Sequence, residues 1–281
     1  MVNAIHQVPR PNTLVVIEKS SARHDYKSRG KKMEFQDKVV FLTGSGGGIG
    51  LAIARALIRQ NASVAMIDVK PQPDNLPEGP GQFLYIKCDL TNDEMVKDAV
   101  QATIEHFGAI HHLVNVAGVL WFGKDKTGLE IDLSVWDQVF DINLKSMVRT
   151  TRHIVPHMRD AGGGAMVHFS TIQCLRGDAA PQDAYQASKA GVVAYSKSLA
   201  IQLGSVGIRS NVILPGPVVS PMQTRWELDP DSAKTVADVI PLGRLGRVED
   251  MAEACLFLLS DRASFISGTE LIVDGGLMAR P

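Results

Sequence analysis

A tyrosine and a lysine four positions apart, Tyr185 and Lys189, are the side chains of this sequence best suited to acid–base chemistry. Residues at i and i+4 share one face of a helix, so this spacing places an ammonium group beside a phenol. A neighbouring cation favours the phenolate, and we therefore expect the pKa of Tyr185 to fall below its usual value of about 10. Such a phenol exchanges a proton with an alcohol or a carbonyl near neutral pH. The pair alone is weak evidence, because the same spacing occurs by chance on many amphipathic helices.

A glycine-rich turn far upstream strengthens this interpretation. The apolar run at residues 39–42 leads into Thr43-Gly44-Ser45-Gly46-Gly47-Gly48-Ile49-Gly50, after which a helical pattern begins. Strand, glycine turn and helix in this order are typical of dinucleotide binding, because glycines let the backbone approach a pyrophosphate and the helix N-terminus offers free N–H groups. A plain tight turn would also join a strand to a helix, but it would not need five glycines within seven positions.

An acid after the second apolar run bears on the choice of dinucleotide. Asp68 follows the run at residues 63–67, about 20 residues after the glycine turn, where an acid accepts hydrogen bonds from an adenosine ribose. It would also repel a 2′-phosphate, and the glycine turn contains no arginine or lysine to hold one. Both features favour NAD over NADP, whereas nearby Lys70 argues for NADP. The alternative interpretation of Asp68 is a solvated acid at the end of a strand.

From residue 35 onward, short apolar runs alternate with longer amphipathic ones, and these elements must position the residues above. Several short runs are almost continuously apolar, as expected for parallel strands buried on both faces. The alternation predicts a single-domain, Rossmann-type, doubly wound parallel α/β sheet of about seven strands with helices on both faces. The expected strands cover residues 39–42, 63–67, 83–86, 112–115, 165–170, 208–214 and 270–273. The expected helices cover residues 49–60, 92–107, 134–159, 183–203 and 248–259.

Residues 34–281 are thus expected to form one dinucleotide-binding catalytic domain. An irregular region from Pro215 to about Pro241 carries the expected substrate loop, in which residues 222–239 fold over the substrate. Four residues are expected to shape specificity: Leu120, Trp121, Gln173 and Gln182. In the loop itself, Met222 and Trp226 either offer apolar contact to the substrate or only pack within the protein.

Composition and charge exclude several classes of protein. The 281 residues are 45% hydrophobic with a net charge of −1, which gives no indication of binding to nucleic acid or an anionic membrane. No apolar stretch approaches the ~20 residues that a membrane-spanning helix needs. Cys88, Cys174 and Cys255 lie far apart and the histidines lack metal-binding spacing. We therefore expect no disulfide framework, no metal site and a cytoplasmic setting.

Residues 1–33 are a basic extension with a net charge of +5, from seven lysines and arginines and two acids. The segment lacks the apolar core and small-residue cleavage site of a secretory signal. One interpretation is functional: a basic arm for a partner, or a transit peptide. The other is a solvated extension, or an upstream start codon with Met33 as the natural beginning, and this interpretation is favoured. Within it, the run Thr13-Leu14-Val15-Val16-Ile17 could add an edge strand or pack on a neighbouring subunit.

Taken together, these features resemble the short-chain dehydrogenase/reductase family from about Met33 to Gly276. The family's Thr-Gly-x-x-x-Gly-x-Gly turn is matched by Thr43, Gly44, Gly48 and Gly50. Further matches follow in the family's order: Cys88-Asp89-Leu90, Asn115-Val116-Ala117-Gly118 (with Val116 in place of a second asparagine), Asn143, Pro215-Gly216-Pro217-Val218 and Asp274-Gly275-Gly276. The resemblance implies that the dinucleotide contacts Gly44, Ser45, Gly47, Gly48, Ile49, Gly50, Asp68, Asp89, Leu90, Asn115, Ala117, Gly118, Tyr185, Lys189, Pro215, Gly216, Val218 and Ser220.

The resemblance also implies a catalytic set of Asn143, Thr171, Tyr185 and Lys189. Tyr185 exchanges the proton, Lys189 lowers its pKa and holds the nicotinamide ribose, and Asn143 orders a water that links Lys189 to solvent. Where the family usually has two serines, this sequence reads Ser170-Thr171. Thr171 keeps a hydroxyl that can polarise the substrate oxygen, with Ser170 as the alternative. It is also open that both hydroxyls only satisfy the backbone at the strand end.

The expected function is hydride transfer between NAD and a secondary alcohol or ketone, such as a sugar, polyol, hydroxy acid or steroid-like molecule. The alternatives are a 3-oxoacyl thioester reductase, or a nucleotide-binding sensor without turnover. Two segments, residues 240–246 and the apolar run 255–259, resemble the tail of tetrameric family members, so self-association to a dimer or tetramer is expected. Fold alone does not name the substrate.

Overall fold

The computed structural model describes residues 15–18, 33–223, 226 and 229–280. Most of the extension at residues 1–33 therefore lies outside the described residues, as do residues 224–225 and 227–228 of the expected substrate loop.

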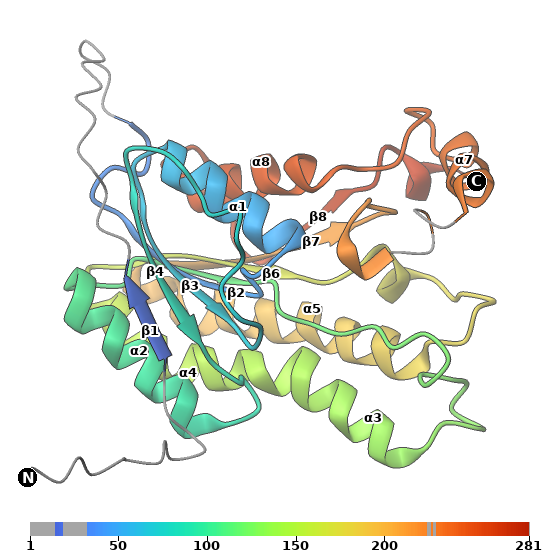
Figure 1. Cartoon of the computed structure of the whole chain (residues 1–281), viewed down its shortest axis with the longest axis horizontal. Helices are drawn as coiled ribbons and strands as arrows, with labels where there is room; N and C mark the ends of the chain where they lie inside the picture. Colours follow the sequence, from blue (N-terminus) through green and yellow to red (C-terminus); the bar gives the residue numbers. More distant parts are fainter. Residues whose placement is uncertain (1–14, 19–32, 224–225, 227–228, 281) are drawn as a thin grey trace, which may run out of the picture.

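An eight-stranded sheet forms the centre of the described chain (Figure 1), with the strand order β1-β4-β3-β2-β5-β6-β7-β8. The strands are β1 (Val15–Glu18), β2 (Val39–Thr43), β3 (Ser63–Asp68), β4 (Gln82–Lys87), β5 (His112–Asn115), β6 (Gly164–Phe169), β7 (Ile208–Pro215) and β8 (Glu270–Val273). Strands β2 to β8 pair in parallel, which confirms the predicted seven-stranded parallel sheet. The eighth strand, β1, pairs antiparallel with β4, as one interpretation of residues 13–17 anticipated.

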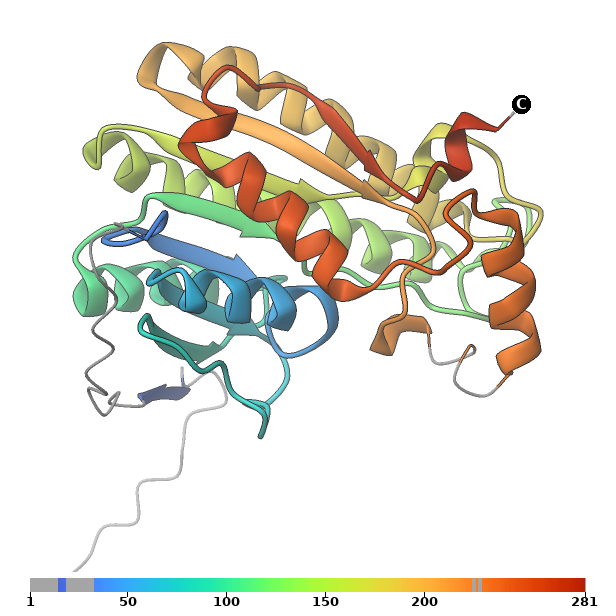
Figure 2. The ribbon, with the colours of Figure 1, turned by 90° about the horizontal axis from the view of Figure 1, so that it is seen from above.

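Helices cover both faces of the sheet, as Figures 1 and 2 show. On one face lie α1 (Gly48–Arg59) and α8 (Val248–Leu259). On the other lie α2 (Asp93–Phe107), α4 (Ser146–Asp160) and α5 (Asp183–Leu203). Two separate clusters of buried apolar side chains fill the two interfaces between sheet and helices. Because the chain turns outward to opposite sides after β2 and β5, a crevice is expected at the carboxyl ends of these strands.

Two predicted segments differ in the structure. The single helix expected at residues 134–159 consists of α3 (Leu133–Phe140), a π-helical turn η1 (Asp141–Lys145) and α4. The region expected to be irregular contains a short helix, α7 (Pro230–Val239). Its start signal is local, because the Asp229 side chain accepts a 3.0 Å hydrogen bond from Ser232 N and proline occupies the first helical turn. The short 3-10 helices are η2 (Ile172–Leu175), η3 (Gly204–Val206), η4 (Pro221–Gln223), η5 (Asp261–Ala263) and η6 (Leu277–Ala279). Within the described ranges, no helix combines the length and the apolarity needed to cross a membrane.

A chain of buried polar side chains crosses the middle of the sheet. The Asn115 amide Nδ2 lies 3.2 Å from His168 Nδ1, and His168 Nε2 lies 3.2 Å from Ser210 Oγ. Thr150 Oγ1 donates to Asn115 Oδ1 at 3.1 Å. Since the amide nitrogen can only donate, His168 accepts at Nδ1 and donates at Nε2 as a neutral ring. Burial lowers the pKa of His168 to about 3, and burial lowers that of His112 in neighbouring β5 to about 3 as well.

These two histidines predict a loss of stability in acid. The unfolded chain binds protons on histidine below pH 6.5, whereas the folded chain does not until about pH 3. The free energy of unfolding should therefore decrease as the pH is lowered through this window, by up to ~1.4 kcal/mol per pH unit for each histidine. We expect His168→Asn to remove about half of this slope, as measured by urea unfolding between pH 6.5 and 4.5.

Ser210→Ala is the matched control for this measurement. It removes the hydroxyl that accepts from His168 but keeps the titrating ring, so it should lower stability at every pH and leave the slope intact. A slope in His168→Asn equal to that of the wild type would contradict the assignment.

Candidate active site

The described chain forms one large cavity at the carboxyl ends of the central parallel strands, with a volume of about 2160 Å³. Binding pockets for one drug-sized molecule measure roughly 300–1,000 Å³, so this cavity has room for a dinucleotide and a second molecule. Most of the predicted site residues line it: Gly44, Gly47, Gly48, Ile49, Asp68, Asp89, Leu90, Ala117, Gly118, Thr171, Tyr185, Lys189, Pro215, Gly216, Val218 and Ser220.

Four predicted site residues, Ser45, Gly50, Asn115 and Asn143, lie behind this wall instead of lining it. A Cβ on Gly50 would stand 2.1 Å from the Gly44 carbonyl oxygen, so glycine lets helix α1 pack directly on the turn. Asn115 is buried in the polar chain described above. The Ser45 hydroxyl is buried and has no hydrogen-bond partner among the described residues. Ser45, Gly50 and Asn115 therefore support the wall from behind.

The glycine turn has the shape of a cradle for a phosphate-containing group. A Cβ on Gly44 would lie 2.7 Å from Ala117 N, whereas one on Gly47 would meet nothing within 4 Å and lies on the cavity wall. Helix α1 begins at Gly48 without a side-chain cap and without an acid in its first turn. The positive end of the helix is thus left for an anion from the cavity. These residues fit the pyrophosphate of a dinucleotide.

Asp68 is held rigidly beside this turn. Its Oδ2 accepts a 2.8 Å hydrogen bond from Gly46 N, and its Oδ1 accepts a 2.9 Å bond from Lys70 N. The carboxylate is therefore a bound part of the cavity wall, and the interpretation as a merely solvated acid does not describe it. The negative charge faces the end of the cavity at the tip of β3, where Val69 and Lys70 also lie.

The π-helical turn η1 places Asn143 against the segment that follows β5. Asn143 Oδ1 accepts from Val119 N at 2.7 Å, and its Nδ2 donates to Val119 O at 3.0 Å and to Ser188 Oγ at 3.1 Å. A Cβ on Gly118 would lie 3.0 Å from Lys189 Nζ and 3.1 Å from Asn143 Oδ1. Asn143 therefore joins the wall after β5 to helix α5, and glycine at position 118 leaves room for both side chains. Its ordering of a water for Lys189 stays a prediction.

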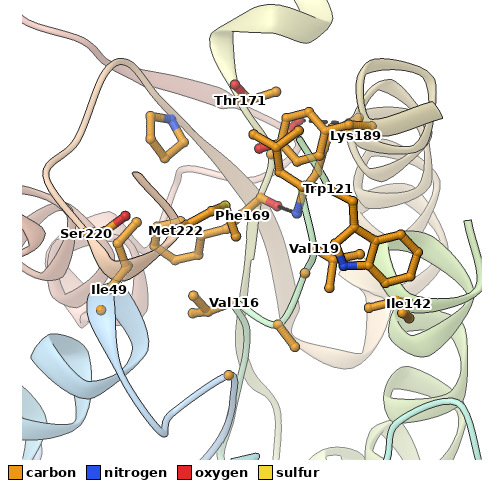
Figure 3. A pocket seen from close by; sticks show the side chains of 18 of the residues that line it. Ile49, Val116, Val119, Trp121, Ile142, Phe169, Thr171, Lys189, Ser220 and Met222 are labelled. Atoms are coloured by element: carbon orange, nitrogen blue, oxygen red, sulfur yellow. Dashed lines mark hydrogen bonds between the residues drawn. The ribbon is translucent and has the colours of Figure 1, made fainter. Parts of the chain in front are cut away.

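Tyr185 and Lys189 both face the cavity from α5, and both are almost fully buried. Lys189 Nζ donates a 2.9 Å hydrogen bond to the carbonyl oxygen of Phe169, drawn as a dashed line in Figure 3. The expected low pKa of the phenol is wrong in this structure: burial raises the pKa of Tyr185 to about 12. Burial likewise lowers the pKa of Lys189 to about 8. The spacing correctly placed both groups on the cavity side of one helix, but the loss of hydration on burial determines both pKa directions.

The two hydroxyls at the end of β6 have different partners. Ser170 Oγ donates a 2.7 Å hydrogen bond to the carbonyl oxygen of Lys189. The Thr171 hydroxyl makes a hydrogen bond to Tyr185 that partly lowers the tyrosine pKa, opposing the larger effect of burial. Ser170 is thus occupied by the backbone, whereas Thr171 lines the cavity (Figure 3) and is hydrogen-bonded to the phenol. This geometry supports Thr171 over Ser170 as the group that meets a substrate oxygen.

A family profile described as enoyl-(acyl carrier protein) reductase matches residues 44–278. The chain belongs to the short-chain dehydrogenase/reductase family. It is 36% identical over 250 residues to cis-4-hydroxycyclohexanecarboxylate dehydrogenase of Sinomonas cyclohexanicum, covering 87% of this chain and 98% of that protein. It is 32% identical over 252 residues to cyclohexanol dehydrogenase of Acinetobacter sp. (strain SE19), covering 88% and 97%. Ligand-free aldohexose dehydrogenase of Thermoplasma acidophilum superposes with a TM-score of 0.81 at 29% identity, covering 89% and 98%.

In this short-chain dehydrogenase, much of the cavity wall is apolar. Five of the six residues expected near the substrate line the cavity: Leu120, Trp121, Gln173, Met222 and Trp226. Figure 3 shows Trp121 and Met222 on opposite sides of the space. Gln182, the sixth, is buried but does not line the cavity.

Sequence reasoning missed part of this wall. Val236 and Val239 come from α7, and Leu277 and Arg280 come from the end of the described chain. Arg280 Nη1 donates a 2.6 Å hydrogen bond to Val239 O, which ties that end to α7. The Asp229–Pro230 start signal could have revealed the helix, but no local signal places it over the cavity. Across the described part of the chain, no cluster of three or more metal-ligating side chains is present.

Proposed function

We propose that this enzyme is an NAD-dependent oxidoreductase that transfers hydride between the nicotinamide and a secondary alcohol or ketone, with an alicyclic compound as substrate. The observation that carries the proposal is the convergence of Thr171, Tyr185 and Lys189 on one cavity that also contains the glycine cradle. The nicotinamide supplies the acceptor or donor of hydride when it is bound. The chain supplies the binding site, the orientation and the proton transfer.

The proposed proton transfer occurs at the Tyr185 hydroxyl. With its pKa raised by burial, the phenol is protonated at neutral pH and can donate its proton to a carbonyl oxygen during reduction. Alcohol oxidation needs the phenolate, so it should accelerate as pH rises. The Thr171 hydroxyl donates a hydrogen bond to the same substrate oxygen, where negative charge develops. Lys189, with its pKa near 8, lies on the same helix face to hold a ribose hydroxyl.

The apolar wall supports an alicyclic substrate over a sugar. Trp121, Met222, Trp226 and Val239 present hydrocarbon surface, which matches a ring carrying a single hydroxyl. A sugar would leave several hydroxyls without partners there, at a cost for each. The relatives named for cyclohexanol and for a hydroxycyclohexanecarboxylate agree with this choice. A relative named 3-oxoacyl-(acyl-carrier-protein) reductase instead favours a 3-oxoacyl thioester, which is the second candidate.

A substrate screen tests the proposal. The full chain is mixed with NAD⁺ and cyclohexanol, cyclopentanol, cis-4-hydroxycyclohexanecarboxylate or glucose, and NADH formation is followed by absorbance. The reverse reaction is assayed with acetoacetyl-CoA and NADH or NADPH. We expect turnover of at least one cyclic alcohol. Turnover of the thioester alone would favour the second candidate, and binding of NADH without turnover of any compound would indicate a nucleotide-binding sensor.

The cofactor preference is proposed to rest on Asp68. We expect Asp68→Asn to raise the affinity for NADPH relative to NADH by about tenfold or more, because the variant removes the negative charge that would face a 2′-phosphate. The two dissociation constants are measured by titrating nucleotide fluorescence.

Asp89→Asn is the matched control. Asp89 also lines the cavity, but its Oδ1 accepts from Thr91 N and Thr91 Oγ1 at a different strand end. Its replacement should change the affinities for NADH and NADPH in parallel. An unchanged NADPH-to-NADH ratio in Asp68→Asn would refute the role of Asp68.

We also propose that the enzyme self-associates through the edge of the sheet at β8. Four residues of the apolar run 255–259 are buried in the chain's own core, so this run is not the contact surface. Phe265 is instead fully exposed, and Ile272 on β8 is also exposed. Unpaired strand edges with exposed apolar side chains favour pairing with a second copy. A monomer by light scattering at micromolar concentration would contradict this.

A further inference from the structure

Asp125 is a buried carboxylate that contacts the catalytic helix from a distant part of the chain. It lies in the connection between β5 and α3 and is 3% exposed. Its Oδ1 accepts a 3.1 Å hydrogen bond from Ala184 N, and its Oδ2 accepts a 2.8 Å bond from Tyr185 N. Both oxygens of one carboxylate are therefore bound to consecutive backbone amides, one of which belongs to the proposed proton donor.

The start of α5 lacks a cap of its own. Its N-cap residue, Gln182, makes no side-chain capping hydrogen bond. The first N–H groups of a helix have no partner within the helix, and the first turn frays unless an acceptor holds it. Tyr185 is the third residue of α5 and so belongs to this turn. Asp125 supplies two acceptors and a negative charge that faces the positive end of the helix.

Two further hydrogen bonds join the same segments. Asp183 N donates to Lys126 O at 3.3 Å, and Gly128 N donates to Asp183 Oδ2 at 2.7 Å. Asp125 N itself donates to Trp121 O at 2.9 Å, which links the carboxylate to the wall of the cavity. In Figure 1 this connection, coloured green, passes beside the start of α5. The same set of hydrogen bonds, between residues 121–128 and the start of α5, therefore fixes both the phenol of Tyr185 and the apolar wall of the cavity.

We propose that Asp125 is the positioning residue for Tyr185. Asp125 does not line the cavity, so it acts on the reaction only through the residues that it holds. It acts by fixing the rotation and height of the first turn of α5, so that the phenol stays beside the Thr171 hydroxyl. This inference rests on the proposed function, because it assigns a purpose to the placement of the proton donor.

The test is a double-mutant cycle on the full chain with the best alcohol from the screen. We expect Asp125→Ala to lower kcat by about 10–100-fold, because misplacement of a catalytic group by about 1 Å can cost 10²-fold. The dissociation constant for NADH should stay within about twofold. In a Tyr185→Phe background, Asp125→Ala should lower kcat no further, because the two changes remove one shared effect. A merely structural role would lower stability and affect both backgrounds alike.

Asp132→Ala is the matched control. Asp132 lies in the same connection and also caps a helix, but as the N-cap residue of α3 itself, where it accepts a 2.8 Å bond from Ser134 N. Its loss should lower Tm by a few degrees and leave kcat within about threefold of wild type. If Asp125→Ala does not fold, Asp125→Asn enters the same cycle, because an amide keeps one acceptor and should give an intermediate kcat.

The outcomes separate this inference from the proposed function. A kcat for Asp125→Ala within about threefold of wild type, or an equal further loss in the Tyr185→Phe background, would overturn the positioning role. Full activity of Tyr185→Phe by itself would instead overturn the proposed function.

Discussion

The Tyr185→Phe variant is expected to lower kcat by a factor of about 10²–10⁴, the usual contribution of a proton-transfer group. The phenylalanine keeps the buried ring and removes only the hydroxyl, which is the atom beside Thr171. The affinity for NADH should change little, because the glycine cradle is untouched. The measurement is steady-state turnover of the best alcohol from the screen, together with a fluorescence titration of NADH.

Tyr195→Phe is the control for this variant. Tyr195 lies on the same helix, and burial also raises its pKa, but it does not line the cavity. Its variant should keep kcat within about twofold of wild type. In the wild type, alcohol oxidation should rise with pH as the phenol ionises. Near-normal turnover by Tyr185→Phe would remove the tyrosine from the reaction.

The second large effect is expected for Lys189→Met. The methionine fills most of the lysine's volume without an ammonium, so kcat should fall by roughly 10²–10³, as for the loss of other preorganised polar groups. Stability near neutral pH should change much less, because the buried charge that is lost is itself costly. The variant also loses the hydrogen bond to the carbonyl oxygen of Phe169, and this loss offsets part of the stability gained by removing the buried charge.

The pH dependence of stability gives a readout independent of turnover. Lys189 has a folded-state pKa of about 8 against 10.5 for the unfolded chain, so the unfolded state binds more protons between these values. Wild-type stability from this group therefore rises with pH through that window, by up to ~1.4 kcal/mol per pH unit. Urea unfolding at pH 8–10 should show a flatter profile for Lys189→Met.

Lys197→Met serves as the control, since Lys197 is an exposed residue of the same helix that pairs with Glu270. Its variant should keep both the turnover and the alkaline slope. Loss of the slope in Lys197→Met, or its retention in Lys189→Met, would contradict the assignment of the buried amine.

Local pattern was sufficient for much of the architecture. The expected strand at residues 112–115 and the expected helices at residues 183–203 and 248–259 agree with the observed bounds of β5, α5 and α8. Apolar periodicity is a property of neighbouring residues, so it can be read without the fold. The glycine turn was equally readable, because its function depends on the backbone freedom of consecutive residues.

The extra helix and the broken helix were not readable in this way. Helix α7 is short and polar, and it gains its apolar partners only where it lies over the cavity. The π-helical turn η1 inside the predicted helix at residues 134–159 puts Asn143 against Val119, a contact between segments far apart in the chain.

The chemistry of the site depended most on tertiary structure. Residue types and order identified Tyr185 and Lys189, and the fold places both on the cavity wall. Their pKa directions could not be inferred from spacing, because a pKa balances local attraction against burial by residues from many segments. Local sequence likewise did not indicate that Thr171, and not Ser170, would contact the phenol, nor that Asp125 would bind the start of α5. Those assignments depend on hydrogen bonds between segments that only the folded chain brings together.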